Sequence, residues 1–263
     1  GVYQAPKGVR FDNPVQIGGV QTCRGSHTHT LVTGPDDASH VYLYNSGTAG
    51  VRSATEMAGC DSGPATNESP SRWLVEVIEV PLANPAAASI VNHARLFTDP
   101  DTGAFDGLQN TPPTPRHPSG ENWSPTPSTN HCHDITAYPE LGIAAGACAG
   151  NGLLIDISDP ANPTRIDAVA DPNYSYWHSA TLNNDGTKVV FTDEWGGGGG
   201  AKCRATDDLS WGADAIFDER NQRVYFGEAG FNILARPARG TASEISISGA
   251  ERTLDMSSVF FTT

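Results

Sequence analysis

Positive charge is scarce in this 263-residue chain, which has only three lysines and a formal net charge of −14. Proteins that bind DNA or RNA present a basic face to the phosphates. The acidic balance therefore argues against nucleic acid as a partner and favours a soluble protein.

Long apolar runs are also missing. No stretch reaches the roughly 18 residues that a membrane-spanning helix needs. The opening segment GVYQAPKGVR lacks the apolar core of a secretory signal. We therefore expect no membrane span, and an exported chain whose leader has already been removed fits best.

Two common catalytic and binding motifs are absent. The pentaglycine at 196–200 is followed by Ala201, Lys202 and Cys203, and not by the Gly-Lys-Ser/Thr of a phosphate-binding loop. No Gly-x-Ser-x-Gly elbow is present either. The sequence thus supports neither phosphate-loop nor acyl-enzyme chemistry.

The five cysteines lie far apart, without the Cys-x-x-Cys spacing of a zinc site. Such spacing suits disulfides in an oxidising compartment, which favours a secreted, extracellular protein. We predict the pairs Cys23–Cys60 and Cys132–Cys148, each closing a local unit. Cys203 is then left to pair with a partner elsewhere.

Leu, Ile, Val and Phe make up about 19% of the chain, close to the level at which disorder is suspected, whereas 28 Gly and 19 Pro indicate many turns. The apolar residues nevertheless cluster in short β-branched runs between turn residues, which is typical of strands. The composition therefore predicts an all-β protein with many short strands.

A strand–turn–strand pattern recurs in segments that begin at Ser26, Asn130 and Ser175. Each opens with a small polar residue, an aromatic ring, any residue and a histidine, followed by alternating apolar positions. A fourth copy begins at Ser210, with Ala213 in place of the histidine.

A second element recurs between these segments, as LVEVIEVPLANP from Leu74 and LLIDISDPANP from Leu153. We interpret it as the outer half of the same repeating unit. His133 and His178 are 45 residues apart, within the spacing of four-stranded propeller blades. We therefore predict a single β-propeller domain over residues 1–263, built of four-stranded antiparallel blades. Residues 99–130 form a Pro/Thr/Ser-rich insertion, either a lid over the channel or a surface excursion.

These motifs resemble the LVIVD-repeat family of secreted bacterial propeller-like proteins. The resemblance covers Gly19 to Gly230 and is carried by HTHTLV, by CHDITAYPELGIAAGACAGNGLLIDISDPANP and by YWHSATLNNDGTKVVFTDEWGGG. It implies a propeller. Residues 236–263 match no motif of the family, so a closed ring is not predicted. Propellers of the selenium-binding-protein type, with several histidines at the channel mouth, are a more distant architectural analogy.

Histidines concentrate in the repeat openings. Because residues i and i+2 of a strand face the same side, three pairs of rings are expected on one level: His27 with His29, His131 with His133, and Tyr176 with His178. First strands of propeller blades line the central channel. We therefore expect His29, His133 and His178 to face one another.

Three convergent imidazoles are suited to a divalent transition metal, with Zn, Cu, Fe and Mn not distinguished. Bound water or substrate would then be activated near four candidate acid–base groups, namely Tyr176, His27, His131 and Asp134. The alternative is that these rings fill a wet channel and hydrogen-bond neighbouring blades.

Two sets of acidic residues are candidates outside the histidine level. Asp193 and Glu194 end the strand after His178, and we expect them at the opposite end of that strand, solvated in a turn. Asp99, Asp101 and Asp106 resemble the start of a calcium loop, although Gly103 and Ala104 depart from its pattern.

Two functions therefore follow from the sequence. The first is a metal-dependent hydrolase, lyase or oxidase that acts on an extracellular small molecule or polysaccharide. The second is a non-catalytic propeller that binds a surface polymer or a protein partner through its loops, with structural histidines.

Overall fold

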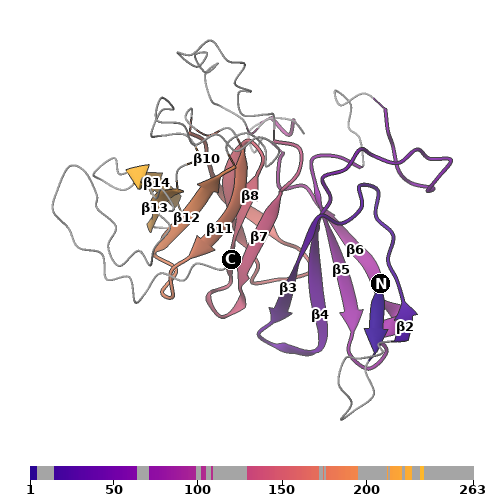
Figure 1. Cartoon of the computed structure of the whole chain (residues 1–263). Helices are drawn as coiled ribbons and strands as arrows, with labels where there is room; N and C mark the ends of the chain where they lie inside the picture. Colours follow the sequence, from indigo (N-terminus) through magenta and orange to yellow (C-terminus); the bar gives the residue numbers. More distant parts are fainter. Residues whose placement is uncertain are drawn as a thin grey trace, which may run out of the picture.

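The protein consists of antiparallel β-sheets joined by turns and loops in the part of the chain that the computed structural model describes (Figure 1). The described residues are 1–4, 15–63, 71–98, 102–104, 108, 129–171, 174, 176–194, 212, 214–220, 223–226 and 232–233. The all-β prediction is confirmed. Among these residues there is no helix of the length and apolarity needed to cross a membrane.

Three sheets follow one another along the chain, and hydrogen-bonded neighbours are consecutive strands. The first contains β3 (Thr28–Gly34), β4 (Asp37–Ser46), β5 (Val75–Pro81) and β6 (Ser89–Ala94). The second contains β7 (Asp134–Tyr138), β8 (Ile143–Cys148), β9 (Asn151–Asp156) and β10 (Thr164–Val169). The third contains β11 (Trp177–Leu182), β12 (Lys188–Asp193), β13 (Asp214–Arg220) and β14 (Arg223–Phe226), with β15 (Asn232–Ile233) beside β13.

Smaller elements complete the described fold. Strands β1 (Val2–Gln4) and β2 (Val15–Gly18) form a separate two-stranded ribbon. Two 3₁₀ turns, η1 (Pro85–Ala87) and η2 (Pro139–Leu141), connect strands within the first and second sheets.

The sequence repeat thus corresponds to one four-stranded antiparallel sheet, as the 45-residue spacing predicts. The segment from Ser210 is a correction. Its strands β13 and β14 pair with β12 and with each other, so they form the outer half of the third sheet and do not open a fourth. Only 35 residues separate Ser175 from Ser210, fewer than the 45 that separate two successive opening strands.

Asx-Pro turns stop the outer strands. After β9, the Asp156 carboxylate accepts the Ser158 N–H at 2.9 Å, and the Asp159 carboxylate accepts the Ala161 N–H at 3.1 Å. Such side-chain contacts stabilise turns. The Pro160 carbonyl in this turn also accepts the buried Tyr44 hydroxyl of β4 at 2.9 Å, which ties the second sheet to the first.

The core consists of two apolar layers, one on each face of the second sheet. The first layer joins Val32, Tyr44 and Val77 of the first sheet to Leu153 and Ile155 of the second. The sheets therefore pack face to face in chain order.

The second layer joins the other face of the second sheet to the third. It contains Ala145 and Leu154 of the second sheet, with Trp177, Phe191 and Phe217 of the third. Because both of its faces are covered, β8 is buried along most of its length, and its small Ala and Gly side chains allow close packing.

Both predicted disulfides are confirmed. Cys23 is bonded to Cys60, and Cys132 to Cys148. Several sequence predictions fall outside the described residues: Cys203, the candidate calcium ligands Asp99, Asp101 and Asp106, residues 236–263 and most of 99–130.

Candidate metal centre

The first strands of the three sheets lie side by side, with their starting ends together. The Thr28 hydroxyl donates to the His133 carbonyl at 2.6 Å, and the Thr30 hydroxyl donates to the Ile135 carbonyl. On the other side, the Trp177 N–H donates to the Ala149 carbonyl at 2.8 Å. Side chains at the starts of β3, β7 and β11 are therefore brought to one place.

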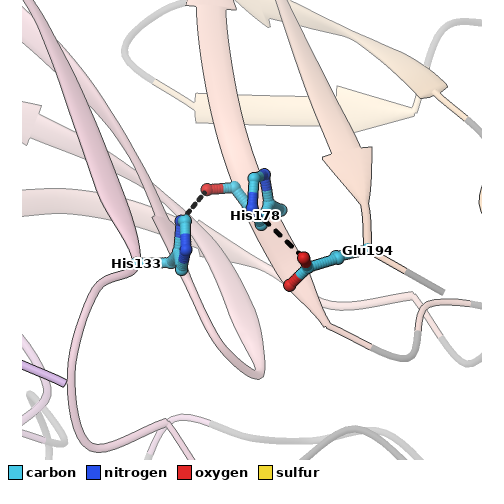
Figure 2. A group of neighbouring side chains, drawn as sticks. All are labelled: His133, His178 and Glu194. Carbon is cyan, nitrogen blue, oxygen red and sulfur yellow. Dashed lines mark hydrogen bonds and ion pairs between the residues drawn. The ribbon is translucent and has the colours of Figure 1, made fainter. Parts of the chain in front are cut away.

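His133, His178 and Glu194 form the centre of this group (Figure 2). One ligand atom from each lies within 4.8 Å of the others. The His133 and His178 rings stack with centroids 3.9 Å apart, and His178 Nε2 is 3.6 Å from Glu194 Oε1. Two imidazoles and a carboxylate thus converge from the second and third sheets.

The position of Glu194 corrects the expectation that it lies at the far end of the strand. Strand β12 runs antiparallel to β11, so the end of β12 is beside the beginning of β11. The Glu194 N–H donates to the Tyr176 carbonyl at 2.8 Å, and Asp193 Oδ1 accepts the Tyr176 N–H at 2.8 Å. The acidic pair therefore lies on the histidine level.

The His133 ring is oriented by the neighbouring sheet. Its Nδ1 is 2.9 Å from the His178 carbonyl oxygen, which can only accept, so Nδ1 carries the hydrogen (Figure 2). In the neutral ring, Nε2 then has the free lone pair. Burial, with the neighbouring His178 charge, lowers the pKa of His133, which favours this neutral, metal-binding form.

His27 joins the group from the first sheet. Its Nε2 is 2.7 Å from His133 Nε2, and the two rings meet edge to face with centroids 4.4 Å apart. Its backbone N–H donates to the Ser46 carbonyl at 2.9 Å, whereas its side chain is exposed. His27 is one of the acid–base candidates predicted from the sequence.

His29 lies on the other side of the first sheet. Thr28, Thr30 and Val32 of β3 face the second sheet, so alternation turns His29 away from it. His29 instead lines a pocket of about 470 Å³ together with Leu43 and Ile78, and His27 borders the same pocket. The convergent set therefore contains Glu194 in the place where sequence analysis expected His29. His27 escapes the alternation because it precedes the first residue of the strand.

His131 and Tyr176 form a second polar contact beside this centre. Tyr176 Oη is 3.0 Å from His131 Nε2, and His131 Nδ1 is 2.5 Å from Asn130 Oδ1. Because the amide oxygen only accepts, Nδ1 carries the hydrogen and Tyr176 donates to Nε2. The Tyr176 ring also lies edge to face on His133, with centroids 5.8 Å apart.

Burial fixes the protonation states of this pair. Burial, reinforced by the Arg24 guanidinium, lowers the pKa of His131 to about 3. Burial, reinforced by the Glu194 carboxylate, raises the pKa of Tyr176 to about 12. At neutral pH the imidazole is therefore uncharged and the phenol protonated.

Asp134 begins β7, directly after His133. Its Oδ1 accepts the Ile135 N–H of the same strand at 2.9 Å. This bond engages the carboxylate with its own backbone, in contrast to the inter-sheet contacts of His131 and His133.

The donor set suits a divalent metal chemically. Two histidines and one carboxylate hold zinc in hydrolases and iron(II) in oxygenases, with positions left for water or substrate. Ligands on one zinc ion at 2.0–2.1 Å in tetrahedral geometry are about 3.3 Å apart. The 3.6 Å between His178 Nε2 and Glu194 Oε1 is close to this value. Both side chains are partly exposed and are free to adjust.

Comparisons with known proteins add only distant likenesses. No family model matches the chain, and no curated protein matches it either. A solved structure of a hypothetical selenium-binding protein from Sulfolobus tokodaii aligns with 10% identity and a TM-score of 0.39, covering 76% of this chain and 39% of that one.

Two further solved structures are similarly distant. A functionally unknown protein from Desulfotomaculum acetoxidans has 11% identity and a TM-score of 0.34, with coverage of 76% and 55%. A putative 6-phosphogluconolactonase from Bacteroides uniformis has 12% identity and a TM-score of 0.34, with coverage of 81% and 57%. The chain thus spans less than two thirds of each of these proteins.

Proposed function

We propose that this protein is a secreted, propeller-type metalloenzyme whose centre is formed by His133, His178 and Glu194. It would act on an extracellular small molecule or glycan as a hydrolase, lyase or oxidase. The observation that carries the proposal is the convergence of these three side chains, with ligand atoms within 4.8 Å of one another. Their donor types match those of catalytic zinc and iron(II) sites.

The propeller assignment is supported by how the sheets are arranged. Two four-stranded antiparallel sheets and a third, with β15 added beside its four strands, pack face to face, and their first strands lie side by side. In a propeller the first strands surround the central channel. The metal centre would then lie at one mouth of this channel. Two disulfides support secretion, because such bonds persist in oxidising compartments.

The chain supplies the groups that a metal-assisted reaction needs. His133, His178 and Glu194 would hold the metal, which would lower the pKa of water and polarise a substrate oxygen when bound. His133 keeps its lone pair directed into the site because its other nitrogen donates to the His178 carbonyl. Tyr176 donates its only hydroxyl hydrogen to His131 Nε2, so it would offer substrate the lone pairs of its oxygen as a hydrogen-bond acceptor.

Metal analysis tests the proposal directly. After incubation with Zn²⁺, Fe²⁺, Mn²⁺ or Cu²⁺ and desalting, we expect one of these ions to be retained at one equivalent per chain. Glu194→Ala and the His133→Ala/His178→Ala double variant should lose it. His29→Ala should retain it, because His29 lies on the far side of the first sheet. Retention in the double variant, or loss in His29→Ala alone, would contradict the proposed ligand set.

Catalysis needs a separate measurement. The metal-loaded protein and its chelated form are compared on aryl esters, aryl glycosides and oxidisable phenols. We expect turnover of one class that disappears on chelation and in Glu194→Ala. Full metal binding with no turnover on any class would leave the enzyme proposal without support and favour a metal-stabilised binding protein.

A non-catalytic propeller is the second candidate function. It is favoured by the fact that His27, His131 and His133 already contact partners within the protein. In that case the rings fill the channel, and a surface polymer or protein binds through the loops. A folded protein that takes up none of the four ions would support this candidate.

A further inference from the structure

We propose that the pocket on the outer face of the first sheet is a binding site for a small, uncharged phenol. The phenol hydroxyl donates to the Asn45 side chain, and the ring lies on Leu43, Ile78 and Val80, all of which line the pocket. The inference goes beyond the proposed metal centre and needs no bound metal.

The floor of the pocket is apolar and belongs to two paired strands. Leu43 of β4 is the register partner of Ile78 of β5, and Val80 follows two residues later on the same face. Tyr44 and Val77, which alternate with these residues, lie in the core against the second sheet. The floor therefore faces outward, and its branched aliphatic side chains suit a flat apolar ring.

The pocket has the size of a small-molecule site. Its volume is about 470 Å³, within the roughly 300–1,000 Å³ of typical ligand pockets. Val2 of β1 and Val20, which follows β2, also line it. An apolar lining with a few polar groups is the usual composition of such sites.

Asn45 offers a hydrogen-bond acceptor beside this floor. Its buried amide donates from Nδ2 to the Gly25 carbonyl at 2.9 Å and to Glu76 Oε2 at 2.7 Å. A carbonyl and an ionised carboxylate both accept, so they fix the position of the nitrogen and use both of its hydrogens. Asn45 Oδ1 has no hydrogen-bond partner within the described part of the chain. A ligand O–H would satisfy this oxygen, which is costly to leave unpaired when it is buried.

The rim beside Asn45 is held in place before any ligand binds. The Cys23 N–H donates to Glu76 Oε1 at 3.2 Å, and the Cys23–Cys60 disulfide anchors the same segment. The Thr22 hydroxyl donates to the Gly25 carbonyl at 2.8 Å. Because the buried Glu76 carboxylate holds both the rim and the amide, binding requires little additional ordering.

The charge of the pocket favours an uncharged ligand. Arg52 is the charged side chain among the described lining residues, and its Nη1 lies 3.2 Å from Glu56 Oε1. This ion pair compensates the positive charge, while the net charge of −14 repels anions. A neutral phenol therefore fits the pocket better than a phenolate or a carboxylate does.

An NMR chemical-shift titration of the ¹⁵N-labelled full chain, without added metal, tests the site. The probes are 4-methylphenol, toluene, which lacks the hydroxyl, and 4-hydroxybenzoate, which carries a carboxylate in place of the methyl group. Leu43→Phe fills the pocket from its floor. Leu31→Phe is the matched control, because Leu31 is the register partner of Leu43 on the same face but lies outside the pocket lining. Near-ultraviolet circular dichroism verifies that both variants are folded.

We expect 4-methylphenol to shift the backbone amides of Leu43, Asn45 and Ile78 and to bind about 10-fold more tightly than toluene, the effect of one buried hydrogen bond. Leu43→Phe should weaken this binding by more than about 10-fold, and Leu31→Phe should leave it unchanged.

Three results would overturn the inference: no saturable shifts at these three amides, equal affinity for toluene, or tighter binding of 4-hydroxybenzoate. The first two are measured on the unmodified protein, so the test does not depend on the folding of a variant. They leave the metal centre unaffected, since that proposal is tested by metal retention.

Discussion

Tyr176 and His131 form a hydrogen-bonded pair of neutral groups beside the proposed metal centre. The phenol donates to His131 Nε2 at 3.0 Å, and Asn130 accepts from Nδ1. A half-buried imidazole with both nitrogens engaged keeps its position and its neutral state. The pair therefore presents a phenol oxygen at a fixed place, with its hydrogen held by His131 and its lone pairs left to accept a hydrogen bond.

Removing the phenol oxygen should reveal the strength of this contact. Tyr176→Phe leaves His131 Nε2 without its donor, so we expect the free energy of unfolding to fall by about 1 kcal/mol, measured by urea denaturation. Tyr42→Phe is the control, because the Tyr42 hydroxyl has only a 3.4 Å contact with Glu79. Equal effects of the two substitutions would contradict the special role of the Tyr176 bond.

Individual site residues show which part of the chemistry can be read from a sequence. His133 and His178 follow from the repeat, because equivalent positions of neighbouring units lie together. Glu194 does not follow, because its proximity depends on the antiparallel return of β12 to the start of β11. His27 and His29 were expected on one level, but only His27 contacts His133. Alternation within β3 turns His29 away, whereas His27 precedes the strand.

Strand β9 packs closely against the third sheet at Gly152. A Cβ added to Gly152 would lie 2.7 Å from atoms of both the Phe191 and Trp177 rings. Gly152→Ala should therefore destabilise the protein by about 1–3 kcal/mol through overpacking, measured by urea denaturation. Gly50→Ala is the matched control, since its added Cβ meets nothing within 4 Å. A Gly152→Ala variant as stable as this control would show that the Phe191 and Trp177 rings move to accommodate the added methyl group without a cost in stability.

The Cys132–Cys148 disulfide fixes the entrance to β7, where His131 and His133 lie on either side of Cys132. The bond spans 16 residues, for which loop-closure entropy predicts about 3 kcal/mol of stabilisation. We expect the Cys132→Ala/Cys148→Ala variant to lose about this much free energy of unfolding and to bind metal more weakly. The Cys23→Ala/Cys60→Ala variant is the control. It removes a bond from the first sheet's loop, so its stability falls while metal binding by His133 is retained.

The strands could be predicted from the sequence more readily than the strands with which they pair. Alternating apolar runs and Asx-Pro turns predicted the strands and the four-stranded unit, because these signals are local. The strands from Ser210 show the limit. Their pattern predicts a strand–turn–strand segment, but the choice between opening a new sheet and completing the third is made by pairing with β12, a contact that the segment itself does not encode.

At the scale of the molecule, the low aliphatic content reflects the stacking of thin sheets. The second sheet is buried on both faces, yet much of its contribution consists of Ala and Gly, with the bulky rings supplied by its neighbours. Composition and repeat spacing predicted the all-β class and both disulfides. The face-to-face order of the sheets depends instead on long-range packing, such as Leu154 of the second sheet against Trp177 and Phe191 of the third, which no single repeat specifies.

Lowering the pH should reduce the free energy of unfolding, because the folded protein keeps some of its histidines neutral. The folded pKa of His131 is lowered to about 3, whereas an unfolded histidine titrates near 6.5. Between these values the unfolded state binds a proton that the folded state does not. The free energy of unfolding therefore falls as the pH decreases through this range, by up to about 1.4 kcal/mol per pH unit for each such group. The lowered pKa of His133 acts in the same direction.

His131→Gln isolates the contribution of one of these groups, because the amide does not titrate and all other acid-sensitive groups remain. Urea denaturation at pH 7 and pH 5 gives the loss of stability for each protein. We expect the unmodified protein to lose about 1–2 kcal/mol more than the variant over this interval. Since only the difference between the two losses enters, any constant destabilisation by the substitution cancels. Equal losses of stability in the unmodified protein and in His131→Gln would mean that His131 takes up its proton without unfolding. The Tyr176–His131 contact would then open to water in the folded protein.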